Sequence, residues 1–170
     1  MQFNDTTASV GLQSSLNTPE VDELLIRISC REPDWQLSSI EQVCNTSLHP
    51  PSTVEDLYIE HQYSQLVWKD DAIENTLWLE LLLPFTTVIN LYISKEFTSG
   101  IAAALQELVA GRITEVLPSL QHIFVEEPRL PGPFQETLPS QEALEKFVAA
   151  RQVSGHSIAI SDWDRYPNTW

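Results

Sequence analysis

The chain has 170 residues, of which 42% are hydrophobic and 19% charged, a globular balance that excludes disorder throughout. It carries 9 basic and 24 acidic residues, a formal net charge of −15, so we expect no nucleic-acid groove and no surface for anionic membranes. The acidic excess is compatible with a basic partner protein, and solubility alone also explains it.

Three sequence features predict where the protein works. Residues 1–6 show neither the basic n-region nor the apolar h-region of a signal peptide. The longest apolar stretch, 77–85, is interrupted by a glutamate and a proline and is too short to cross a bilayer. The two cysteines, Cys30 and Cys44, have the spacing of neither a metal site nor a disulfide framework. We therefore expect an intracellular protein, cytoplasmic or nuclear, with both cysteines reduced.

The first segment along the chain is expected to be a leader. Residues 1–20 are rich in Ser, Thr, Asn and Gln and show no hydrophobic period, which predicts a flexible segment. From Val21 onward, a short apolar segment with the alternating pattern of a β-strand recurs along the sequence. Its copies are 21–26, 54–59, 88–93 and 120–125, with a degenerate fifth copy at 157–160.

The copies recur at a fixed step. Their second apolar anchors are 33, 34, 32 and 35 residues apart, at Leu24, Leu57, Leu91, Ile123 and Ile158. A constant period in this range is typical of stacked repeats. We therefore treat each copy as the strand of one repeating unit.

Segments with helical spacing separate these strands. They are 37–44, 72–83, 98–110 and 140–153, with Pro84 and Gly111 as expected stops. Because strands and helices alternate, we expect parallel strands joined by right-handed crossovers. The fixed step then predicts an α/β, leucine-rich-repeat-like solenoid of about four to five strand-helix repeats over 21–165, with a tail at 166–170. A doubly wound sheet is the alternative, but it normally needs a Gly-rich first turn, which this chain lacks.

Five stretches have a distinctive sequence: 78–97 (WLELLLPFTTVINLYISKEF), 103–109, 114–124, 147–152 and 161–164. Together they resemble the C-terminal region of F-box-like proteins of mushroom-forming fungi, the basidiomycetes. The similarity covers roughly residues 22–165, and the matching stretches are structural rather than catalytic.

The resemblance implies a protein–protein interaction module, similar to the target-binding repeat region of a ubiquitin-ligase receptor. Family members also carry an N-terminal F-box, a short helical motif that docks onto a ligase adaptor. Nothing before Val21 has that pattern, so we expect no adaptor binding from this chain. A stand-alone scaffold domain or a truncated product, with no ubiquitin role, is the alternative. The strand near 24–28 would be an open edge unless residues 1–20 or a preceding part of the protein covered it.

The sequence contains no recognisable catalytic or metal-binding motif. Its four histidines, His49, His61, His122 and His156, do not have metal-ligand spacing. No GxSxG elbow, P-loop or GxGxxG occurs. We therefore expect no enzyme activity, no cofactor and no metal, and we keep an acidic enzyme with an unrecognised site as a third hypothesis.

The concave face of the predicted solenoid is the candidate site for an unknown protein target. If the anchors point into the core, strand alternation places the intervening residues on this face, with Ala159 continuing a central aromatic column. The residues of the predicted site are Leu25, Arg27, Tyr58, Glu60, Tyr92, Phe124 and Glu126. Exposed aromatics bordered by acids suit a protein partner. Stacking of the same rings between strands would equally serve to stabilise the sheet.

Overall fold

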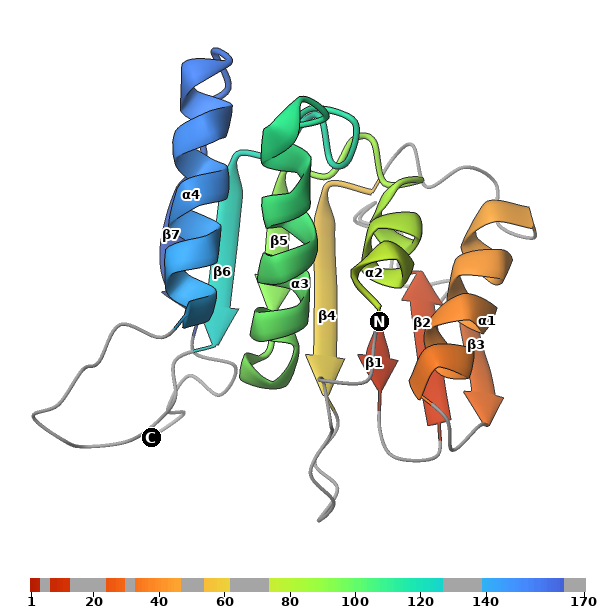
Figure 1. The fold of residues 1–170 in the computed structure, drawn as a ribbon. Helices are drawn as coiled ribbons and strands as arrows, with labels where there is room; N and C mark the ends of the chain where they lie inside the picture. The colour runs from red at the N-terminus through yellow and green to blue at the C-terminus, as the bar shows by residue number, and fades with distance from the viewer. Residues whose placement is uncertain are drawn as a thin grey trace, which may run out of the picture.

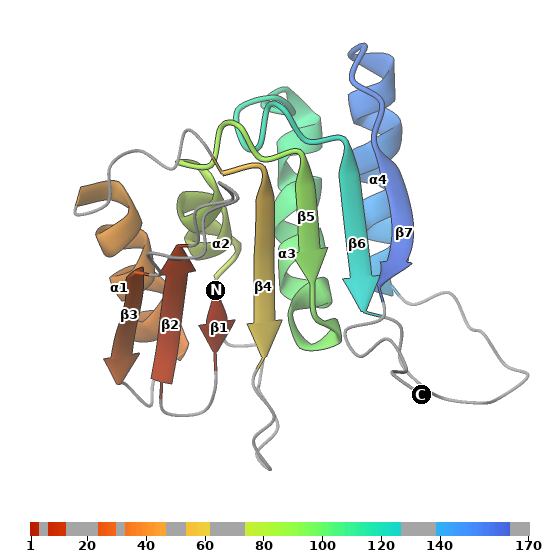
Figure 2. The same cartoon turned by 180° about the vertical axis from the view of Figure 1, so that it is seen from behind.

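The fold is one sheet with helices on one side. The computed structural model describes residues 1–3, 7–12, 24–29, 33–46, 54–61, 74–126 and 139–163. Its seven-stranded sheet has all four described helices gathered on one face (Figure 1). The view from behind shows the other face, over which no described helix lies (Figure 2).

Strands and helices alternate from the third strand onward. The strands are β1 (Gln2–Phe3), β2 (Thr7–Leu12), β3 (Leu24–Ser29), β4 (Asp56–His61), β5 (Asn90–Ile93), β6 (His122–Glu126) and β7 (Ala159–Trp163). The helices are α1 (Pro33–Thr46), α2 (Asn75–Leu82), α3 (Lys95–Glu107) and α4 (Pro139–Val153), and a short 3₁₀ turn, η2 (Leu108–Ala110), extends α3. Every strand and helix expected from the repeat is therefore present, with its ends shifted by a few residues.

The C-terminal half of the sheet has the predicted connectivity. Strands β4, β5, β6 and β7 are parallel and lie side by side in chain order, joined through α2, α3 and α4. The expectation of alternating strand–helix units with parallel strands is confirmed for these four strands.

The N-terminal part differs from the expectation. The complete strand order is β3-β2-β1-β4-β5-β6-β7, with β2 antiparallel to both β1 and β3. The predicted leader therefore contains two strands, and they separate the first expected repeat strand, β3, from the second, β4. The apolar residues Ala8, Val10 and Leu12 alternate with small ones in β2, which is a strand pattern inside a Ser/Thr-rich composition. Pairing with β2 covers one edge of β3.

A dense apolar layer between helices and sheet fixes the direction of each strand's side chains. Five helix-facing residues of the central strands are buried, namely Leu57, Ile59, Leu91, Ile93 and Ile123, and Val125 packs against them partly buried. Trp78 of α2 and Phe97 of α3 are fully buried against each other, with ring centroids 5.4 Å apart. Burying each of these large rings removes a large apolar area from water and so stabilises the layer. The alternate residues of the same strands consequently point away from the helices.

Successive units are joined by the same hydrogen bond. Thr87 Oγ1 donates to the carbonyl oxygen of Val54 at 3.0 Å. Ser119 Oγ donates to the carbonyl oxygen of Thr86 at 2.9 Å, again 33 residues earlier. The sequence period thus corresponds to a repeated contact between neighbouring units.

Arg151 of α4 is a fully buried cation without a carboxylate partner among the described residues. Its guanidinium donates to the carbonyl oxygens of Ile113, Leu117 and Pro118 at 3.0, 2.9 and 3.2 Å. It also lies over the Phe147 ring, 5.8 Å from the centroid. Burial lowers the pKa of the guanidinium. These contacts attach α4 to the loop that leads into β6.

Candidate functional site

Three aromatic rings stand in a row on the open face of the sheet, the face turned away from the helices. Tyr58 and Tyr92 are stacked, with centroids 4.2 Å apart and planes 7° from parallel. Tyr92 and Phe124 are stacked in the same way, at 4.5 Å and 8°. We call Tyr58, Tyr92 and Phe124 the aromatic row. Tyr58, at one end of it, is 41% exposed.

Strand register produces this row. Tyr58 pairs with Tyr92, and Tyr92 with Phe124, in parallel strands. Because neighbouring strands lie about 4.8 Å apart, equivalent flat side chains come within stacking distance. The spacing of the sequence repeat is therefore what aligns the rings.

Trp163 of β7 packs edge-on against the aromatic row. Its ring centroid lies 6.0 Å from that of Tyr58 and 5.5 Å from that of Tyr92, at interplanar angles of 60° and 67°. Edge-to-face contacts of this kind are favourable between aromatic rings. The indole thus reaches across the sheet and covers part of the row.

A hydrogen-bonded line of polar side chains runs beside the aromatic row, two residues earlier on each strand. Asn90 Nδ2 donates to Asp56 Oδ1 at 2.7 Å. Asn90 Oδ1 lies 3.1 Å from His122 Nδ1. We call Asp56, Asn90 and His122 the polar ladder. The His122 ring also stacks on Phe124, with centroids 6.0 Å apart, which links the ladder to the row.

Carboxylates border the other side of the row. Strand alternation places Glu60 of β4 and Glu126 of β6 on the open face, two residues beyond Tyr58 and Phe124. Strands β4 to β7, all of whose residues the structure describes, contain no Lys or Arg. The open face of these strands is therefore acidic.

The Tyr58 hydroxyl stays protonated over the physiological range. Burial raises its pKa to about 12, and the neighbouring Tyr92 and the charges of Asp56 and Glu60 act in the same direction. A neutral phenol can donate a hydrogen bond but cannot act as a nucleophile or general base near pH 7.

The structure brings five of the seven predicted site residues together. Tyr58, Tyr92 and Phe124 form the row, and Glu60 and Glu126 flank it on the same face. The remaining two, Leu25 and Arg27, lie on β3, which β2 and β1 separate from β4, and their side chains are outside the described residues. Extending the column to β3 was wrong because the N-terminal strands occupy that position.

The register of β7 also corrects the prediction. Ser161, not Ala159, pairs with Phe124, and Ala159 pairs with His122. Ile160 rather than Ile158 is thus the residue equivalent to Ile123. Two alternating isoleucines give the same sequence signal at either position, so only the pairing distinguishes them. Because the shift is two residues, the faces are unchanged, and alternation from Ala159 through Ser161 already places Trp163 on the open face.

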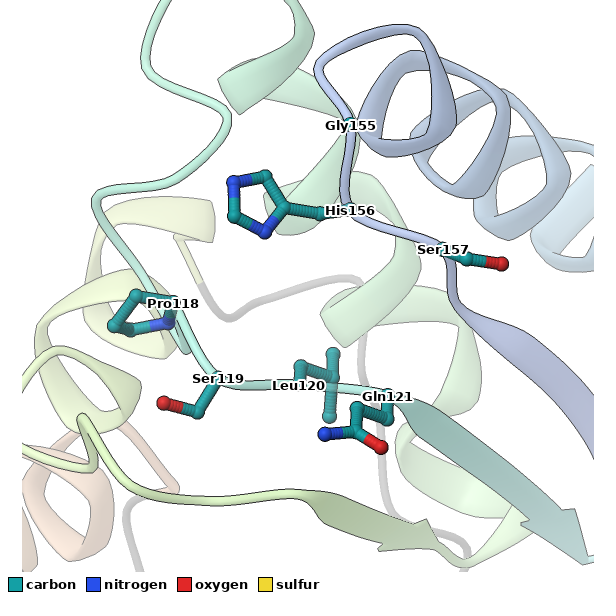
Figure 3. Close-up of a pocket in the computed structure, with 7 residues that line it drawn as sticks. All are labelled: Pro118, Ser119, Leu120, Gln121, Gly155, His156 and Ser157. Carbon is teal, nitrogen blue, oxygen red and sulfur yellow. The ribbon is translucent and has the colours of Figure 1, made fainter.

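A shallow hollow lies at the edge of the sheet, between the loops that lead into β6 and β7 (Figure 3). It has a volume of about 390 Å³ and is lined by 118–121 and 155–157. Its polar side chains come from both loops, with Ser119 and Gln121 on one and His156 and Ser157 on the other.

The chain matches no protein-family model, no curated protein and no solved structure. In the described ranges, no three His, Cys, Asp or Glu side chains are grouped to hold a metal ion. No helix within those ranges combines the length and apolar character needed to cross a membrane.

Proposed function

We propose that the chain is a protein-interaction module that holds its target on the open face of β4 to β7. The observation that carries this proposal is the partly exposed aromatic row between a polar ladder and carboxylates. Tyrosine and tryptophan provide large contact areas at low entropy cost, which is why they dominate binding surfaces. The Tyr58 hydroxyl, whose pKa burial raises, is available as a hydrogen-bond donor to a bound target.

We further propose that β4 to β7 and the helices between them form a leucine-rich-repeat-like solenoid. Three observations support it: the step of about 33 residues, in-register parallel strands, and the hydroxyl-to-carbonyl bond that recurs between units. Solenoids of this kind use the exposed strand face to bind partners.

The resemblance to fungal F-box-like proteins suggests that the module presents targets to a ubiquitin ligase. A scaffold role without a ligase is the second candidate, because binding a target at the aromatic row requires no ligase adaptor. Sequencing the transcript upstream of Met1 separates the two. An in-frame F-box would support the ligase role, and a stop codon directly upstream would remove it.

The binding role is tested by selecting protein fragments from a displayed library on the wild-type chain. The selected fragments are then measured against the Tyr58→Ser/Tyr92→Ser double variant. We expect at least about tenfold weaker binding, since aromatic anchors contribute the largest share of interface energy. Trp35→Ser is the control, because Trp35 is 70% exposed on α1, in the helical layer. Fragments that bind the double variant as well as the wild type would refute the assignment.

A further inference from the structure

The hydrogen bonds of the polar ladder run in one direction. The Asp56 carboxylate can only accept, so the Asn90 amide must turn its Nδ2 toward it. Asn90 Oδ1 then faces His122, whose Nδ1 must carry the proton and donate. In the neutral imidazole this leaves Nε2 as an acceptor. With a neutral imidazole, both ends of the ladder, the Asp56 carboxylate and His122 Nε2, present acceptors, and a ligand has to bring the donors.

The charge distribution favours a cationic ligand. The exposed cations among the described side chains lie in the helical layer and its loops, each beside a carboxylate. The pairs are Lys95–Glu96 at 3.8 Å, Arg112–Glu115 at 2.6 Å and Lys146–Glu142 at 2.8 Å. The open face has Asp56 and Glu126 without such a partner on strands β4 to β7. On the open face a basic ligand would find carboxylates beside the aromatic row and no competing Lys or Arg on strands β4 to β7.

The order of the rows on the open face favours an extended ligand. The aromatic row lies between acceptors on both sides, and rows two residues apart on a strand are separated by about 6.6 Å. An extended chain crossing the strands along the row sends alternate side chains to opposite sides. Lys and Arg can lay their aliphatic stems on aromatic surface while their charged ends reach polar groups.

We infer that the open face of β4 to β7 binds an extended, basic segment of a partner protein. Arg or Lys side chains of that segment donate to Asp56 and His122 on one side of the aromatic row and to Glu126 on the other. The inference rests on the proposed function and names the chemical class of its target.

The probe is a synthetic peptide of alternating arginine and serine, compared with the same peptide carrying citrulline in place of arginine. Citrulline keeps the shape of arginine without its charge. Each peptide is titrated into the ¹⁵N-labelled protein and followed by amide chemical shifts. We expect the arginine peptide to shift the resonances of β4 to β6 and to bind at least about tenfold more tightly than the citrulline peptide.

The matched variants remove equal charge from the two faces. Asp56→Asn/Glu126→Gln should weaken the arginine peptide about fivefold. Glu80→Gln/Glu145→Gln, on exposed positions of α2 and α4, should leave its affinity unchanged. Equal affinity for both peptides, equal weakening by both pairs of substitutions, or shifts confined to the helices would each overturn the inference.

These outcomes are distinguishable from failure of the proposed function. If neither peptide binds while library-selected fragments still require Tyr58 and Tyr92, the open face is a binding site for a different chemistry. If no selected fragment requires those tyrosines, the proposed function itself fails.

Discussion

Replacing Tyr92 with serine removes the middle ring of the aromatic row. Tyr92 contacts three rings, Tyr58, Phe124 and Trp163, whereas Tyr58 contacts two of the described rings. Each aromatic pair contributes about 0.5–1.5 kcal/mol beyond area burial, and partial exposure favours the lower half of that range. We expect Tyr92→Ser to lower the free energy of unfolding by about 1.5–3 kcal/mol and Tyr58→Ser by about 1–2 kcal/mol.

The assay is urea denaturation of the two single variants and the double variant, followed by circular dichroism. The double variant should lose about 1 kcal/mol less than the two single losses together, because both remove the same stacked pair. Trp35→Ser, at a mostly exposed position, should change stability by less than about 0.5 kcal/mol. Equal losses in the two single variants, or additivity within about 0.3 kcal/mol, would refute the stacking argument.

Other regions give independent predictions. Arg151→Met should lower the free energy of unfolding by about 2–4 kcal/mol, because buried carbonyls lose their donor, and unchanged urea denaturation would contradict that role. Gly111→Ala should cost about 1–2 kcal/mol in the same assay, since the φ of 132° strains any residue with a Cβ. Burial raises the pKa of the Cys44 thiol from 9.0 to about 11, so the stability present below pH 9.0 should fall as the pH rises to about 11. The free energy of unfolding should fall by up to about 2.7 kcal/mol over this pH range. In Cys44→Ala, urea denaturation at the same pH values should show a smaller fall.

The repeat could be read from the sequence because each unit repeats the same local alternation. Leu57, Leu91 and Ile123 are buried on the helix side of paired strands, as their spacing indicates. The same spacing aligned Tyr58 with Tyr92. The core of the candidate site therefore follows from periodicity alone.

Other features depend on pairing between segments that have no such period. The sequence of β2 lies in a Ser/Thr-rich stretch whose composition does not indicate a strand. Its place in the sheet is set by pairing with β1 and β3. The register of β7 could not be chosen between Ile158 and Ile160 without its partner strand. Arg151 reads as an ordinary surface cation on a helix, and only the packed loop shows that it is buried.

Binding at the open face is tested most directly by mapping a library-selected fragment on the protein with NMR cross-saturation. We expect the saturated amides to lie on β4 to β7, with Tyr92, Phe124 and Trp163 among them. Saturation confined to α2, α3 and α4 would place the target on the helical layer and contradict the assignment of the aromatic row as the binding site.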